Sequence, residues 1–156
     1  MSNALPHLNS CVLTPSQEHV INSFKEITDP QEKYKKIIEL GLQAFPLPQD
    51  QRTESNLVSG CQSTVYLNVI ESSDGKLYFS AYSEALISAG LAWIATQFYS
   101  GLRPEQVLQT SPIFIEHLQL SQSLTPGRSN GLVSMIDLIK KKSIQIYMRT
   151  HSVVDR

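Results

Sequence analysis

Two short runs of alternating apolar residues, separated by a turn signal, constrain the fold of this chain more than any other feature. Residues 65–69 place Val, Leu and Val at every second position, and residues 77–81 place Leu, Phe and Ala in the same way. Between the runs lies Ser72-Ser-Asp-Gly75, and an Asp-Gly pair between two alternating runs is a strong hairpin signal. The sequence therefore predicts an antiparallel β-hairpin.

Helical patterns lie on both sides of this hairpin. Thr14-Pro15 and Asp29-Pro30 each place a capping residue before a proline at the first helical position, which predicts two helices upstream. After the hairpin, Ser83 is expected to cap a long helix that ends at Gly101. Because this helix is apolar over most of its circumference, we expect it to be the central buried one.

The remainder of the chain also reads as helical. Two X-Pro starts, at residues 103–105 and 111–113, predict two short helices. Residues 124–131 read as a loop, and a final helix with an apolar stripe follows. This order of elements predicts an α+β fold in which a small antiparallel β-sheet is covered by helices.

The length of 156 residues fits one domain with a single core. Residues 1–13 and 151–156 lack periodicity and are expected to be flexible tails, as chain termini often are. The sequence thus predicts one domain over residues 14–150.

Charge and hydropathy argue against nucleic-acid and membrane functions. The chain has thirteen Lys and Arg residues and fourteen Asp and Glu residues. The net charge of −1 therefore lacks the excess of positive charge that is typical of nucleic-acid-binding proteins. The basic run 140–142 reads as a solvated helix end. The longest apolar stretch, 85–95, is too short to span a bilayer, and the N-terminus shows no secretory signal. We therefore predict a reducing, cytoplasmic location.

The two cysteines, Cys11 and Cys61, form neither a disulfide framework nor a metal site, because no Cys or His pair has ligand spacing. Cys11 lies in the predicted tail and is expected to be incidental. Cys61 follows Ser-Gly60 and precedes Gln-Ser in a tight turn that leads into the first strand, where a thiol can be presented to another molecule. A free cysteine is also often a small buried hydrophobe, so spacing alone leaves both interpretations open.

Several motifs, in order along the chain, resemble the SufE-type sulfur acceptors, which are partners of cysteine desulfurases in iron–sulfur cluster assembly. The motifs are Leu47-Pro48, Val58-Ser-Gly-Cys-Gln-Ser-Thr-Val65, Asp74-Gly75 with Tyr78-Phe79-Ser80, Ser83-Glu84-Ala85 with Gly90-Leu91, and Thr125-Pro-Gly-Arg-Ser-Asn-Gly131. The chain departs from the family where Tyr66 replaces a frequent Trp, where Glu84 replaces a frequent Asp and where Gly127 replaces a frequent Ser. None of these departures removes a reactive group.

The resemblance implies a SufE/IscU-like fold in which Cys61 accepts sulfane sulfur and carries it as a persulfide. Gly60 would shape the backbone of the acceptor loop, Gln62 belongs to the same turn, and Ser63 would form a local hydrogen bond there. Arg128 matches the arginine of the family's second loop. Its guanidinium would either stabilise the sulfur anion or simply hold the two loops together.

The resemblance also implies the partners of such a protein. They are a SufS-like or CsdA-like cysteine desulfurase, which holds the pyridoxal phosphate, and a downstream iron–sulfur scaffold complex; a homodimer is permitted. No cofactor of its own is implied, and the protein would be a sulfur-transfer accessory rather than a stand-alone enzyme.

Two alternatives remain. The first is an iron–sulfur scaffold of IscU-like fold, which would need several cysteine thiolates. The second is a cysteine-dependent hydrolase, which would need an oriented histidine base. We also expect the apolar residues Leu57, Val58 and Val65 to let the Cys61 side chain turn inward in the free protein, which would slow its reactions.

Overall fold

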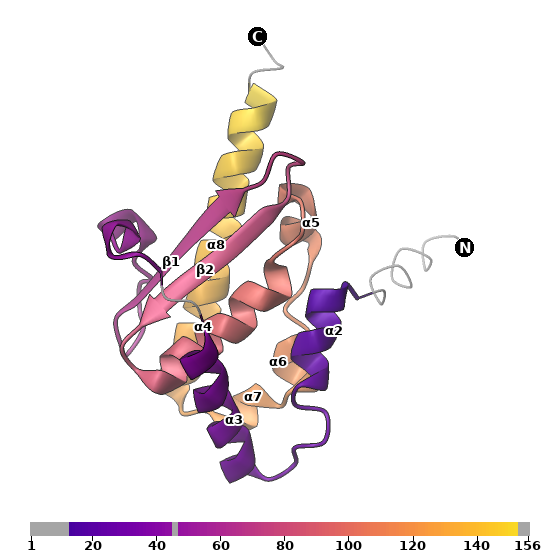
Figure 1. The fold of residues 1–156 in the computed structure, drawn as a ribbon, viewed down its shortest axis with the longest axis vertical. Helices are drawn as coiled ribbons and strands as arrows, with labels where there is room; N and C mark the ends of the chain where they lie inside the picture. Colours follow the sequence, from indigo (N-terminus) through magenta and orange to yellow (C-terminus); the bar gives the residue numbers. More distant parts are fainter. Residues whose placement is uncertain (1–12, 45–46, 153–156) are drawn as a thin grey trace, which may run out of the picture.

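The computed structural model describes residues 13–44 and 47–152 of the chain (Figure 1). Cys11 and most of the predicted N-terminal tail lie outside these residues, so the predicted domain boundaries stay predictions. The described elements, in chain order, are α2 (Pro15–Asn22), α3 (Pro30–Gln43), the 3₁₀ turns η2 (Gln49–Gln51) and η3 (Glu54–Asn56), β1 (Val65–Glu71), β2 (Leu77–Ser83), α4 (Leu86–Tyr99), α5 (Pro104–Gln109), α6 (Phe114–His117), α7 (Leu120–Ser123) and α8 (Pro126–Ser152).

The predicted hairpin is confirmed. Strands β1 and β2 pair antiparallel, with Val65 opposite Ser83 at one end and Glu71 opposite Leu77 at the other. Gly75 adopts φ 85° in the turn, where its N–H donates to the carbonyl of Ser72 at 2.9 Å. Within the described residues these two strands form the whole sheet, so the predicted small antiparallel sheet of an α+β fold is also confirmed.

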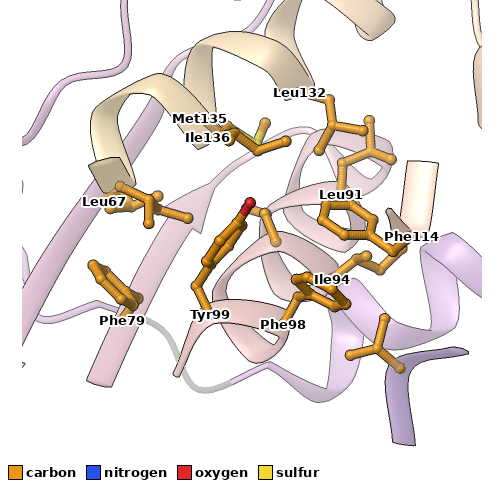
Figure 2. Close-up of a cluster of buried hydrophobic side chains, with 14 of the residues drawn as sticks. Leu67, Phe79, Leu91, Ile94, Phe98, Tyr99, Phe114, Leu132, Met135 and Ile136 are labelled. Carbon is orange, nitrogen blue, oxygen red and sulfur yellow. The ribbon is translucent and has the colours of Figure 1, made fainter. Parts of the chain in front are cut away.

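The central position of α4 is confirmed as well. Helix α4 packs against α3, both strands and α8, and its side chains are buried around most of its circumference. Figure 2 shows Phe98 and Tyr99 of α4 among core side chains from the hairpin, α6 and α8. The backbones of α3 and α4 lie in direct contact at Gly90. A Cβ atom at this position would overlap the carbonyl oxygen of Ile37. In Figure 1 helix α8 passes behind the hairpin and extends beyond its turn.

Both upstream helices begin where the sequence predicts. The Thr14 hydroxyl accepts a hydrogen bond from the N–H of Gln17 at 3.1 Å, and the Gln17 side chain accepts one from the Thr14 N–H. A carboxylate oxygen of Asp29 accepts from the N–H of Glu32 at 3.1 Å in the same way. These caps satisfy N–H groups that a helix start otherwise leaves unpaired.

Three predictions about helix boundaries are wrong. Residues 126–131 form the first turns of α8 instead of a loop, because the carbonyl of Thr125 starts the helix by accepting from the Ser129 N–H at 2.9 Å. Ser83 does not cap α4: it ends β2, and its hydroxyl donates to the carbonyl of Thr64 across the hairpin at 2.8 Å. The basic run 140–142 lies in the middle of α8, not at a helix end.

Candidate functional site

The residues before β1 form a closed loop that carries Cys61. The N–H of Val58 donates to the carbonyl of Val65 at 2.9 Å, and Leu57 forms a bridge with Tyr66, so residues 59–64 bulge out from a closed base. The hydrogen bond from Ser83 fastens the carbonyl of Thr64 to β2. Because both ends are fixed, the backbone between them determines where the thiol lies.

Gly60 adopts a backbone conformation that favours glycine. Its φ of 79° is in the left-handed region, which residues with a side chain seldom adopt. This turn sets the direction of the next residue, Cys61, whose side chain points back toward the protein and is half-buried. The expectation that the thiol turns inward is consistent with this position.

The valines at the two ends of the loop, Val58 and Val65, are both buried. Val58 and Val65 are 4% and 0% exposed, and Cys61 packs against the apolar core to which both belong. Leu57, the third apolar residue expected there, is instead 38% exposed. The Cys61 Sγ lies 3.7 Å from the carbonyl oxygen of Gly131, to which the thiol can donate a weak hydrogen bond.

Burial raises the pKa of the Cys61 thiol above its ordinary value, because an apolar environment disfavours the charged thiolate. The thiolate is the nucleophilic form, so a raised pKa slows attack by this cysteine at neutral pH. The thiol's hydrogen-bond acceptor is a backbone carbonyl and not an imidazole, which gives no support to the hydrolase alternative. The site thus holds a half-buried thiol whose charged, nucleophilic form is disfavoured in this position.

The loop lies on the first turns of α8. A Cβ atom at Gly131 would come within 3.3 Å of the Cys61 Sγ, and one at Gly127 would come within 2.6 Å of the Gln62 Cδ. A Cβ atom at Gly60 would lie 3.4 Å from the Ser134 Oγ. Residues 127, 131 and 134 share one face of the helix, because their spacing of four and three residues matches the helical repeat. We call this surface the glycine face of α8.

Sequence reasoning missed the glycine face. It counted Gly127 only as a departure from the family pattern and placed Gly131 in a loop. The sequence did contain a usable signal. Two glycines four residues apart lie on the same side of a helix and leave that side without side chains, so another backbone can approach it closely. The Thr125-Pro126 start signal would have shown that both glycines are helical.

The other predicted site residues lie at different distances from the thiol. Gln62 lies beside Cys61 with its side chain against Gly127. Ser63 is half-buried, and its hydroxyl makes no hydrogen bond within the described part of the chain, so the local bond expected of it is absent. Arg128 is half-buried and places its Cζ atom 5.7 Å from the ring centroid of Tyr34 on α3. Its guanidinium makes no hydrogen bond to the Cys61 thiol.

The segment before the loop is held by α8. The Lys142 Nζ donates to the Asn56 Oδ1 at 2.6 Å and to the carbonyl of Ser55 at 3.4 Å, and the Asn56 Nδ2 donates to the carbonyl of Gln51 at 2.7 Å. Burial and the neighbouring charge of Lys141 lower the pKa of Lys142. One lysine of the basic run thus has a structural role in fixing η3 near the acceptor loop.

No group of three or more His, Cys, Asp or Glu residues that could hold a metal ion is found within residues 13–44 and 47–152. Cys61 is the free cysteine of this part of the chain. Scaffolds hold clusters mainly through several thiolates, and a single described thiol does not provide such a set. None of the described helices is both long and apolar enough to cross a membrane.

The chain resembles known proteins over most of its length. The family described as "SufE: Fe-S metabolism associated domain" matches residues 18–143. An uncharacterized SufE-like protein of Synechocystis is 30% identical over 135 residues, which cover 86% of this chain and 84% of that protein. The SufE-like protein 1, chloroplastic/mitochondrial, of Arabidopsis thaliana is 29% identical over 137 residues, covering 88% of this chain but 37% of the Arabidopsis protein.

A solved structure supports the fold. The solution structure of a hypothetical protein from Thermus thermophilus superimposes with a TM-score of 0.68 at 20% sequence identity, covering 86% of this chain and 97% of that one. At this identity the likeness concerns the fold alone. With the family match over residues 18–143, the sequence and the architecture agree, and the chain belongs to the SufE family of proteins associated with Fe-S metabolism.

Proposed function

We propose that this protein accepts sulfane sulfur on Cys61 from the persulfide of a cysteine desulfurase and passes it on for iron–sulfur cluster assembly. The observation that carries the proposal is the position of this thiol: it lies in a glycine-shaped loop, closed at its base, in a chain that belongs to the SufE family. A loop of this kind can present one thiol to a second protein while the rest of the fold stays fixed.

The transfer step is a thiol–persulfide exchange. The Cys61 thiolate attacks the outer sulfur of the donor persulfide and forms a new S–S bond to it. The S–S bond within the donor breaks, and the donor cysteine leaves as a thiolate. The proton lost by Cys61 goes to solvent or to the leaving thiolate, and no electrons are gained or lost overall.

The resting geometry requires a change before this step. Attack at sulfur needs steric access and a thiolate, whereas Cys61 is half-buried with a raised pKa. We propose that the desulfurase favours an outward position of the loop, in which the thiol leaves the carbonyl of Gly131 and regains water. The glycine at position 60 lowers the backbone cost of such a turn.

The inward position would also protect the carried sulfur. An exposed thiolate is readily oxidised, and an exposed persulfide can lose its sulfur to other thiols. A persulfide that returns to the glycine face would be shielded on one side by α8. The compartment must keep Cys61 reduced, as the cytoplasm does, and we retain that location as an expectation.

The partners follow from this chemistry. Cleavage of the carbon–sulfur bond belongs to the pyridoxal phosphate of a SufS-like or CsdA-like desulfurase, so this chain needs no cofactor of its own. The recipient would be an iron–sulfur scaffold complex. Arg128 would act once the loop has moved, either by stabilising the sulfur anion or by keeping the start of α8 against α3 through Tyr34.

The proposal is tested by incubating the protein with a SufS-type cysteine desulfurase and L-cysteine and measuring its intact mass and the desulfurase turnover. We expect a persulfide on Cys61 and a faster turnover, because transfer clears the enzyme's own persulfide. A purified protein that binds a cluster through Cys61 and takes up no sulfur would instead support the scaffold alternative.

A further inference from the structure

A polar hollow lies beside the acceptor loop and has no part in the sulfur exchange described above. Its volume is about 360 Å³, and it is lined by Gln49, Arg52, Thr64, Tyr66, Tyr82 and Glu84. Thr64 is the last residue of the loop that carries Cys61 and is fastened to β2 through Ser83. A group bound in this hollow would therefore be held next to the acceptor loop.

Arg52 is fixed in place before any ligand arrives. Its Cζ atom lies 3.5 Å from the ring centroid of Tyr82, and its Nε donates to the carbonyl of Leu47 at 2.9 Å. Tyr82 in turn pairs with Tyr66 across the hairpin, on the sheet face that does not pack against α4. A guanidinium fixed on two sides loses little conformational entropy when it binds, which favours recognition.

The remaining donors of Arg52 are available. Its two terminal Nη groups make no hydrogen bond or ion pair within residues 13–44 and 47–152, although the side chain is half-buried. Glu84 lines the same hollow, but its exposed carboxylate forms no ion pair with Arg52. A planar fork of unused N–H groups matches a carboxylate, which can accept two parallel hydrogen bonds.

We propose that this hollow receives a single Asp or Glu side chain of the protein that delivers sulfur to Cys61, with Arg52 as the residue that binds it. The proposal rests on the proposed function, and it names the chemistry by which the partner is recognised. A protein side chain fits better than a free small molecule, because docking beside Thr64 fixes the partner relative to the loop.

The test compares three variants for binding to a purified SufS-type cysteine desulfurase by biolayer interferometry at low and high salt. Arg52→Gln removes the charge, Arg52→Lys keeps the charge but loses the fork, and Arg103→Gln is the matched control. Arg103 is exposed and lies beside Gly75 at the opposite end of the hairpin. Iodoacetamide labelling of Cys61 without the desulfurase reports whether a variant disturbs the loop itself.

For Arg52→Gln we expect the Kd to rise about tenfold at low salt, as loss of a charge-assisted hydrogen bond implies, and to depend less on salt. Arg52→Lys should fall between Arg52→Gln and wild type, and Arg103→Gln should bind as wild type. Labelling of free Cys61 should stay at the wild-type rate in every variant, since the contact is made only with the partner.

Three results would overturn the proposal. The first is equal binding by Arg52→Gln and Arg103→Gln. The second is faster Cys61 labelling in Arg52→Gln and Arg52→Lys, which would show that Arg52 only positions the loop. The third is loss of wild-type binding in millimolar L-alanine, which would assign the hollow to a free amino acid. Failure of wild-type protein to gain sulfur would count against the proposed function instead, and the binding comparison would still decide the role of Arg52.

Discussion

Replacing Gly131 by alanine should loosen the Cys61 loop without loosening the fold. The new Cβ would come within 3.3 Å of the Cys61 Sγ, a contact that requires one of the two to move by a few tenths of an ångström. The α8 backbone is fixed by its hydrogen bonds, whereas the thiol is half-buried with solvent on its other side. The loop is therefore the part that gives way.

The effect on stability is the difference between two terms of similar size. Alanine in a helix interior is more favourable than glycine by about 1 kcal/mol. Overpacking by one methyl group costs about 1–3 kcal/mol in a closed core, and the lower end applies where a neighbour can move outward. The free energy of unfolding should therefore change by no more than about 1 kcal/mol, which is a shift in Tm of about 2–4 °C for a domain of this size.

The effect on the thiol should be larger, because displacement exposes the Cys61 side chain and returns its pKa toward the ordinary value. We expect faster iodoacetamide labelling of Gly131→Ala than of wild type under native conditions, with equal rates after denaturation. Asn130→Ala is the matched control, since it also improves helix propensity on α8 but changes an exposed side chain. Contact between the loop and the glycine face would be refuted if Gly131→Ala raised the free energy of unfolding by about 1 kcal/mol, the full helix-propensity gain, while Cys61 was still labelled at the wild-type rate.

Two further outcomes are expected. Because burial raises the pKa of Cys61, its labelling rate should reach a plateau at a higher pH in the folded protein than in the denatured one, and Tm should fall as pH rises through the folded-state pKa. That fall should be absent in Cys61→Ser; coincident pH profiles in the two states would contradict the burial argument. Arg128→Ala should weaken sulfur transfer in the desulfurase assay while lowering stability by only about 0.5–1 kcal/mol, the size of a partly exposed cation–π contact. A large drop in Tm with normal transfer would show that Arg128 is structural.

Much of the fold could be predicted because its signals are local. The alternation in residues 65–81 fixed the hairpin, and its Asp74-Gly75 turn supplied the positive φ. The starts of α2 and α3 could be predicted from Thr14-Pro15 and Asp29-Pro30, because the capping side chain and the proline act on the same helical turn.

The errors arose where one local signal competed with another or with a tertiary contact. Two glycines with Ser and Asn neighbours indicate a loop at 126–131, yet the segment is helical from the Thr125-Pro126 start onward, and the Cys61 loop packs on its glycine face. Helix α7 follows Gln119, which adopts φ 52°, and no turn residue such as glycine marks that position in the sequence. Ser83 is recruited into β2 by its pairing with Val65 rather than serving as a cap.

The candidate site divides in the same way. Cys61 and Gly60 could be found from the sequence, because the turn and the reactive side chain are adjacent. Two glycines four residues apart could have marked the glycine face of α8, but its contact with the thiol could not be predicted, because the Cys61 Sγ and the carbonyl of Gly131 are 70 residues apart in the chain. Contacts at that separation depend on how α8 crosses the hairpin, which no local pattern records. The hollow around Arg52 could not be predicted from the sequence either, because its lining residues come from elements that are separate in the chain: η2, the Cys61 loop and both strands.

The measurement that tests the central claim most directly is the intact mass of wild type and Cys61→Ser after incubation with a cysteine desulfurase and L-cysteine. Serine is close in size to cysteine and should preserve the fold, which circular dichroism will check. We predict that wild type gains one sulfur atom, about 32 Da, and speeds desulfurase turnover, because exchange at a thiol is the step proposed. Cys61→Ser should do neither. A folded Cys61→Ser protein that still gains sulfur, or still stimulates turnover fully, would contradict the assignment of Cys61 as the acceptor.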